Sequence, residues 1–300
     1  MGEKTEQVIE DILESYREHT MTVRIDEENT INKEIIIEII EELRKVLFPG
    51  YFDKNRVRSE YVKYLVGERI EFIQYHLKKQ VARALGTADD CDFCPRSGHA
   101  SEADGIVEKF LESIPKIREF LVTDVQAAFD GDPAAYSTDE IIFSYPGIHA
   151  ITVYRIAHEL VLLGVPQIPR IMTEYVHSLT GIDINPGAEI GRYFCIDHGT
   201  GIVIGETTEI GEHVKIYQGV TLGALSTKRG QLLKGEKRHP TIGNHVTIYS
   251  GTSVLGGETV IGDGVTIGGN AFIVESISAG MKVNVKNPEL QYIRDNTGRG

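Results

Sequence analysis

The residues best suited to chemistry in this sequence include a histidine that directly follows an aspartate. His198 comes immediately after Asp197. Histidine is the side chain whose ordinary pKa suits removal of a proton from a weak nucleophile, such as a hydroxyl group, near neutral pH. A base of this type works better when a carboxylate holds its second ring nitrogen, because this fixes the tautomer and stabilises the imidazolium. His198 is therefore a candidate general base.

A second group of side chains could bind an anion. The segment 223–241 carries five cations and a single acid, Glu236. The cations are Lys228, Arg229, Lys234, Lys237 and Arg238. This cluster stands out because the chain has 31 Lys and Arg against 44 Asp and Glu, a net charge of −13. It predicts either a site for a polyanionic ligand of modest size, such as a phosphorylated cofactor, or a solvated loop.

Metal binding is not expected. Cys91, Cys94 and His99 offer three zinc ligands within nine positions, but a structural zinc site normally takes four, and the third cysteine, Cys195, lies far along the chain. The odd cysteine count and the absence of a secretory signature at the start predict a cytoplasmic protein. The net negative charge argues against nucleic acid as a partner, and no uncharged run approaches the roughly 20 residues of a membrane span.

The elements that must position these side chains change character near residue 180. Of the 31 glycines, 22 lie in residues 181–300. Residues 1–180 instead show apolar residues at three-and-four spacing, with helix ends at Pro49-Gly50 and at Gly181 and a capping-box start at Ser137 and Glu140. These residues predict an all-helical domain.

Residues 181–280 contain an internal repeat, in which aliphatic residues return every six positions. The repeat positions are Ile184, Ile190, Ile196 and Ile202, then Ile210, Ile216 and Leu222, then Ile242, Ile248 and Val254, then Ile261, Ile267 and Ile273. Strands of a sandwich would recur at about 8 to 12 residues with hairpin turns. A six-residue period instead predicts a parallel β-helix, from which the segment 223–241 extends as a loop. The expected fold class is α + β, with residues 281–300 as a C-terminal tail.

The hexads that begin at Ile184, Ile190 and Ile196 resemble the left-handed β-helix of the hexapeptide acyltransferases, which work as trimers with active sites between subunits. More specifically, the chain resembles serine O-acetyltransferase. The segments that carry this resemblance are Asp132-Pro133-Ala134, Gly147-Ile148-His149-Ala150, Tyr154-Arg155-Ile156, Asp183-Ile184-Asn185-Pro186, Asp197 to Thr207, Gln218 to Gly223, and Arg238-His239-Pro240. They lie in order on both predicted domains and cover about residues 110–280.

The resemblance implies transfer of an acetyl group from acetyl-CoA to the hydroxyl of L-serine. It assigns His198 as the base and Asp183, fifteen residues earlier, as its carboxylate partner. It also implies that Asp132 and Asp197 receive the substrate amino group, that Arg238 binds the carboxylate, and that His239 lies near the hydroxyl. The residues expected along the coenzyme A site are Gly223, Ala224, Lys234, Gly243 and Ser250. Ala224 stands where the family has a second glycine.

The same resemblance implies a role in cysteine biosynthesis, inhibition by L-cysteine at the serine site, and a homotrimer or a dimer of trimers. The motifs that carry the resemblance do not reach residues 1–105, which leaves these two assemblies open. Members of the family bind O-acetylserine sulfhydrylase through a terminal isoleucine. This chain ends in Arg299-Gly300, which argues against that complex.

Three other functions are compatible with parts of the pattern. Another hexapeptide O-acyltransferase could act on homoserine, a sugar or an antibiotic, although the helical domain and the pairing of Asp132 with Arg238 argue against a sugar or antibiotic acceptor. A β-helical metal-dependent hydratase could use His198, His213, His239 and His245. A non-catalytic trimeric scaffold is the third. We expect His213 and His245 to be exposed corner residues, and His149 and His158 to have packing or interface roles.

Overall fold

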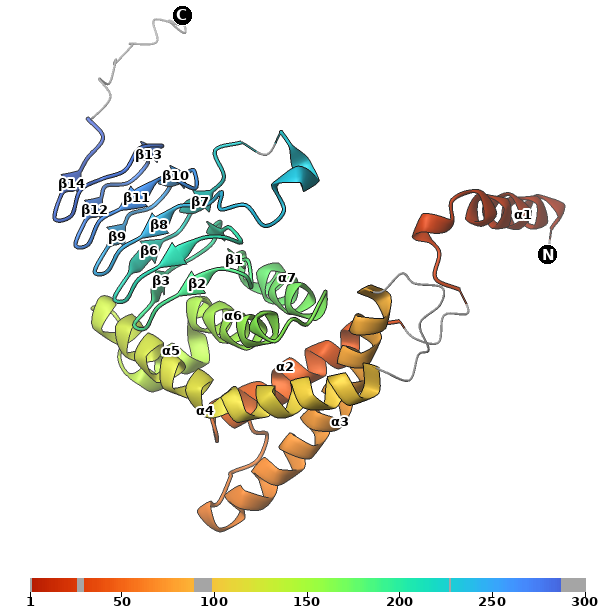
Figure 1. Ribbon diagram of the computed structural model, residues 1–300. Helices are drawn as coiled ribbons and strands as arrows, with labels where there is room; N and C mark the ends of the chain where they lie inside the picture. The colour runs from red at the N-terminus through yellow and green to blue at the C-terminus, as the bar shows by residue number, and fades with distance from the viewer. Residues whose placement is uncertain (1, 26–29, 89–98, 227, 287–300) are drawn as a thin grey trace, which may run out of the picture.

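The computed structural model describes residues 2–25, 30–88, 99–226 and 228–286. Helices occupy its N-terminal part and short strands its C-terminal part (Figure 1). The α-helices are α1 (Glu3–Glu18), α2 (Lys33–Leu47), α3 (Val62–Ala88), α4 (His99–Gly131), α5 (Thr138–Ser144), α6 (Pro146–Leu162) and α7 (Ile168–Thr180). Short 3-10 helices are η1 (Thr20–Thr22), η2 (Ser59–Tyr61) and η3 (Gly230–Leu233). No helix in the described part of the chain is long and apolar enough to cross a membrane.

The predicted helix signals lie at observed helix ends. The side chain of Ser137 accepts a hydrogen bond from the Glu140 N–H at 3.2 Å and caps α5. Gly181 ends α7 in the left-handed conformation, with φ of +70°, which a glycine adopts without steric cost. Helix α6 is buried on most of its surface because it lies between the other helices and the strands. By contrast, α1 buries no residue and stands apart from the rest (Figure 1).

The strands form a parallel solenoid of three sheets, as the repeat predicts. Sheet A has the order β1-β4-β7-β10-β13, sheet B β11-β8-β5-β2, and sheet C β14-β12-β9-β6-β3. The strands are β1 (Asp183–Ile184), β2 (Glu189–Ile190), β3 (Cys195–Asp197), β4 (Val203–Ile204), β5 (Glu209–Ile210), β6 (Lys215–Tyr217), β7 (Thr221–Gly223), β8 (Thr241–Ile242), β9 (Thr247–Ile248), β10 (Ser253–Leu255), β11 (Val260–Ile261), β12 (Thr266–Ile267), β13 (Phe272–Ile273) and β14 (Lys282–Val283). The last strand lies beyond residue 280, where the sequence predicts a tail.

The register explains which residues form the core. Ile184 pairs with Ile204, and Ile204 pairs with Leu222, so one aliphatic side chain per strand points inward on successive coils. Ile196 and Ile204 are eight positions apart, whereas Ile184 and Ile190 are six apart. On β4 of sheet A, the residue that points into the core is thus Ile204, whereas Ile202 is buried at the corner before this strand. Two extra residues therefore enlarge the corner that carries His198.

A buried ion pair joins the helices to the first coil. Arg155 of α6 contacts Asp124 of α4, with Nε to Oδ2 at 3.1 Å, and their side chains are 6% and 0% exposed. The same guanidinium donates to the backbone carbonyls of Ile190 at 2.5 Å and Gly191 at 2.6 Å. Asp124 also accepts a hydrogen bond from the Phe194 N–H at 3.0 Å. The helical part thus fixes the coil from which β3 and its corner emerge.

The opposite end of the solenoid consists of strands at the edges of their sheets. Strand β13 forms the edge of sheet A and β14 the edge of sheet C. Phe272, on β13, is 69% exposed. In the described part of the chain, no helix covers this last coil (Figure 1).

Candidate active site

His198 projects from the enlarged corner between sheets C and A. It directly follows β3 and has a φ of +57°, and Gly199 and Gly201 continue the corner with φ of +94° and +81°. This left-handed backbone turns the imidazole outward, and the ring is 76% exposed. Its Nε2 lies 3.7 Å from Oδ1 of Asp197.

A second carboxylate approaches from the helical part. Asp132 follows the end of α4, and its Oδ2 accepts a hydrogen bond from the Tyr145 hydroxyl at 2.6 Å. Its Oδ1 accepts one from the Ala134 N–H at 2.8 Å. These two donors, with Lys215 and His198 nearby, hold the pKa of Asp132 below its usual range. The same hydrogen bond raises the pKa of Tyr145 to about 12, so Tyr145 remains a donor at neutral pH.

Lys215 links the two carboxylate-bearing segments. Its Nζ lies 2.8 Å from Oδ2 of Asp197 and donates to the backbone carbonyl of Gly131 at 2.6 Å. Lys215 and Asp197 are 18% and 17% exposed, so solvent screens this pair only in part. The result is one polar surface on which Asp132, Asp197 and His198 lie near one another.

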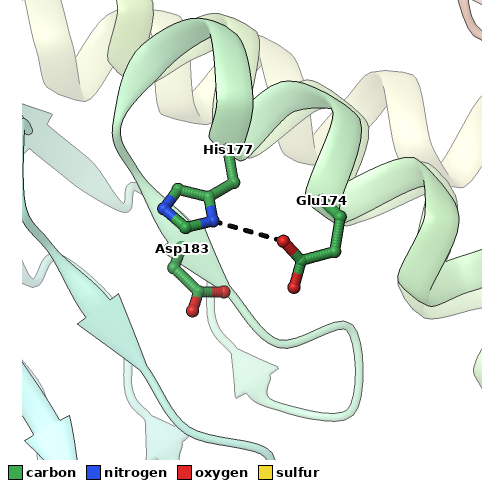
Figure 2. Close-up of side chains that lie close together, drawn as sticks. All are labelled: Glu174, His177 and Asp183. Carbon is green, nitrogen blue, oxygen red and sulfur yellow. Dashed lines mark hydrogen bonds and ion pairs between the residues drawn. The ribbon is translucent and has the colours of Figure 1, made fainter.

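Asp183 lies on a neighbouring coil and has other contacts in this structure. Its Oδ1 is 3.7 Å from Nη1 of Arg170, at the start of α7. Figure 2 shows Asp183 beside His177 and Glu174, whose Nδ1 and Oε2 are 3.4 Å apart. Each of these three residues offers one atom that could bind a metal ion, and these atoms all lie within 4.8 Å of one another. Arg170 also pairs with Glu174, so a guanidinium already supplies the positive charge that these carboxylates need.

Arg238 and His239 occupy a different edge of the solenoid, between sheets A and B. Arg238 pairs with Glu206 and donates from Nη1 to the Leu233 carbonyl at 3.3 Å. The Thr207 hydroxyl fixes the backbone of both residues, because it accepts hydrogen bonds from the Arg238 and His239 N–H groups at 3.0 and 3.1 Å.

The His239 ring is neutral near physiological pH. Burial, with the positive charge of Arg238, lowers its pKa to about 4. Its Nδ1 accepts a hydrogen bond from the Thr207 N–H at 3.0 Å, which assigns the ring proton to Nε2. This imidazole can therefore donate a hydrogen bond from Nε2, but it is not suited to hold a second proton.

The residues predicted to contact coenzyme A lie at several places. Gly223 ends β7, Ala224 follows it, and Lys234 is exposed in the loop that leaves sheet A there. Gly243 follows β8 on sheet B. Ser250 lies after β9, at a corner between sheets C and A, two coils beyond the corner of His198.

Comparison with known proteins decides the family. The chain is 46% identical over 251 residues to a plasmid-encoded serine acetyltransferase of Synechococcus elongatus, and the match covers 81% of this chain and 77% of the relative. The chain belongs to the serine acetyltransferase family. It is accordingly an acyltransferase. No family model matches the sequence.

Solved structures agree with this assignment. A serine acetyltransferase of Entamoeba histolytica, isoform 3 in complex with cysteine, matches with a TM-score of 0.73 and 38% identity over 86% of this chain and 84% of that one. The enzyme of Neisseria gonorrhoeae in complex with serine matches with a TM-score of 0.54 and 26% identity over 87% and 97%. The solenoid matches the left-handed β-helix of these serine acetyltransferases, as the sequence predicts.

Several polar residues of the candidate site could not be identified from the sequence alone. Tyr145 and Lys215 contact the predicted aspartates from a helix start and a strand, and neither matches a motif. Their roles depend on contacts between residues distant in the sequence, and Lys215 also reaches the helical part through the Gly131 carbonyl. Glu206 and Thr207 lie inside a motif that indicates the family, but the motif does not predict that they hold Arg238 and His239.

Four other histidines lie where the sequence predicts packing or exposure. His213 and His245 are exposed corner residues, and their rings stack with centroids 4.7 Å apart. His158 contacts the Pro186 carbonyl through Nδ1 at 2.9 Å, and burial lowers the pKa of His149 to about 4. Cys91 and Cys94 lie outside the described residues.

Replacing Gly205 tests whether the edge between sheets A and B, which carries Arg238 and His239, belongs to the functional site. A Cβ at this position would overlap the His239 ring, so Gly205→Ala must displace that ring. Because small misplacements at an active site cost about 10²-fold in rate, we expect a loss of that order in kcat/KM. Gly67→Ala, on α3 with open space around it, is the control. Full activity of Gly205→Ala would place His239 outside the functional site.

Proposed function

We propose that this protein moves the acetyl group of acetyl-CoA to the hydroxyl of L-serine, with His198 as the general base. The convergence of His198, Asp197 and Asp132 on one surface carries the proposal, because it sets a base beside two anions that can receive an ammonium group. A solved relative from Neisseria gonorrhoeae binds serine, which supports the choice of acceptor.

The reaction balances without an acyl-enzyme intermediate. His198 accepts the hydroxyl proton while the serine oxygen attacks the thioester carbonyl carbon, which gives a tetrahedral oxyanion. The carbon–sulfur bond then breaks, and the imidazolium returns the proton to the departing thiolate. The products are O-acetylserine and coenzyme A. A backbone N–H group would stabilise the oxyanion.

Asp183 has the role of bracing the imidazole in this proposal. A Cβ built on Gly181 would lie 3.2 Å from the Thr200 side chain, so the segment before Asp183 touches the corner of His198. The carboxylate now faces Arg170 at 3.7 Å and must turn toward the ring to hold its second nitrogen. Such a partner fixes the tautomer and stabilises the imidazolium.

The serine carboxylate is assigned to Arg238, whose planar fork of donors suits a carboxylate. Arg238 and His198 lie on different edges of one solenoid, with sheet A between them. We therefore propose that the complete site forms where two copies of the chain meet, with His198 from one copy and Arg238 and His239 from the next. Three such contacts close a trimer.

Coenzyme A is assigned to the same seam. Gly223, Ala224 and Lys234 lie on the edge of Arg238, and Ser250 lies on the edge of His198, so both sides of the seam carry predicted contacts. Exposed cations of the loop, Lys234 among them, can face its phosphates. Gly243, which follows β8 of sheet B, is also assigned to this coenzyme A site.

L-cysteine should compete with serine, because it offers the same ammonium and carboxylate groups. Two solved relatives from Entamoeba histolytica contain bound cysteine, which supports this assignment. The proposed amino and carboxyl contacts do not touch the side chain, so they bind an amino acid with a hydroxymethyl or a sulfanylmethyl side chain alike.

The activity is tested by thiol release from acetyl-CoA with L-serine, L-homoserine or a sugar acceptor in parallel. We expect the highest kcat/KM with L-serine and inhibition by L-cysteine that is competitive with serine. A preference for a sugar, or cysteine inhibition that serine does not relieve, would contradict the proposed amino-acid site.

A further inference from the structure

Lys215 lies at the centre of the proposed amino-acid site, although it carries no assigned role. It is on β6, where its position pairs with Cys195 of β3, so its side chain stands diagonally opposite Asp197. From there Nζ contacts Oδ2 of Asp197 at 2.8 Å and the Gly131 carbonyl at 2.6 Å. One ammonium group thus contacts both the strand that precedes His198 and the helix end that precedes Asp132.

The contact selects which oxygen of Asp197 is available. Lys215 occupies Oδ2, whereas Oδ1 lies 3.7 Å from Nε2 of His198. A charge-assisted hydrogen bond of this kind fixes the carboxylate orientation more firmly than a neutral one. The free oxygen is therefore directed at the space beside the candidate base, where a substrate amino group must lie.

The second aspartate, Asp132, is held by other donors, and Lys215 contacts the residue before it. The Asp132 oxygens accept from the Tyr145 hydroxyl and the Ala134 N–H, while the residue before Asp132 contributes its carbonyl to Lys215. The packing at this junction is close, since a Cβ on Gly131 would lie 3.4 Å from Nζ of Lys215. Through these contacts Lys215 fixes the distance between Asp132 and Asp197.

The charges balance once a substrate is present. Asp132 and Asp197 supply two negative charges, Lys215 supplies one positive charge, and an amino-acid ammonium supplies the other. Without Lys215, one ammonium would face two carboxylates that repel each other, and Asp197 would lose the contact that fixes its orientation.

We propose that Lys215 is a positioning residue that orients Asp197 and fixes its distance from Asp132, so that the pair accepts a single substrate ammonium group. The inference rests on the proposed serine site. Lys215 itself does not touch the reacting atoms. Its loss should therefore weaken binding of the amino acid more than it slows the chemical step.

The test compares steady-state constants of Lys215→Met with those of Lys282→Met. Lys282 is an exposed cation on the same sheet, in β14, and serves as the matched control. Because a hydrogen bond between charged groups is worth a factor of about ten or more, we expect Lys215→Met to raise the KM for serine at least tenfold. The kcat should stay within about threefold and the KM for acetyl-CoA should not change, as expected when binding alone is lost.

Further variants separate positioning from general damage. Lys215→Arg keeps the charge but carries a bulkier group, so it should raise the KM for serine less than Lys215→Met does. In a double-mutant cycle, Lys215→Met should add little to Asp197→Asn, because the lysine acts through that carboxylate. An unchanged or lower KM in Lys215→Met would overturn the inference, because it would show that the lysine competes with the substrate ammonium.

Asp132→Asn and Asp197→Asn distinguish failure of the inference from failure of the proposed site. If both raise the KM for serine and Lys215→Met does not, the amino-acid site stands and only the role of Lys215 is wrong. If neither raises it, the proposed amino-acid site is wrong and the inference falls with it.

Discussion

Replacing His198 by asparagine should lower kcat for acetyl transfer by about 10³-fold, within the range that a general base contributes. The substituted side chain cannot take the serine proton at neutral pH. Asparagine is the suitable replacement because it tolerates the positive φ of +57° at this position, whereas alanine would strain the corner. The measurement is single-turnover acetyl transfer at saturating serine and acetyl-CoA.

Because the His198 ring is exposed, a loss of catalysis can be distinguished from a loss of stability. Since the His198 side chain is 76% exposed, its removal should leave the thermal unfolding midpoint within about 1 °C of the parent. Asp183→Asn should cause a smaller loss of kcat and add little to His198→Asn, because the carboxylate acts through the ring. Retention of more than a tenth of the parent kcat in His198→Asn would remove this residue from the mechanism.

Replacing Asp124 by alanine should destabilise the protein by about 3 to 5 kcal/mol, the cost of leaving a buried charge without its partner. The guanidinium of Arg155 would keep its carbonyl acceptors at Ile190 and Gly191 but lose its only described carboxylate. The Phe194 N–H would lose its acceptor as well. Urea unfolding at fixed protein concentration measures the change.

Asp104→Ala is the matched control for this prediction. Asp104 lies on the same helix, α4, and pairs with Lys78 at 3.0 Å, but its side chain is 55% exposed. Exposed pairs contribute at most about 1 kcal/mol, so the control should unfold near the parent midpoint. Equal midpoints for Asp124→Ala and Asp104→Ala would show that the buried pair does not hold the helices to the first coil.

The sequence predicts the architecture because its signals are local and repeated. The six-residue period of Ile184, Ile190 and Ile196 is enough to predict the solenoid, since each coil repeats the same inward position. The cap at Ser137 and the glycine at 181 mark helix ends through backbone chemistry that involves only a few neighbours. These predictions are confirmed because they do not depend on distant contacts.

The site is less predictable, for physical reasons. The period continues to Ile202, yet the inward residue of that strand is Ile204, because the corner takes two extra residues that a regular repeat does not anticipate. The contacts of Lys215 with Asp197 and Gly131 join segments that are 18 and 84 positions apart. Which aspartate faces which cation is therefore a property of the packed chain, and the role of Asp183 beside His198 stays a prediction.

The last coil of the solenoid has a consequence for how the molecule responds to heat. Each coil of such a stack contacts only its neighbours, so disorder spreads inward from an end that nothing covers. No helix of the described residues covers the end at β13 and β14, whereas the first coil is fastened to α6 through Tyr154 and Arg155. Unravelling should therefore begin at the C-terminal strands and reach the His198 corner last.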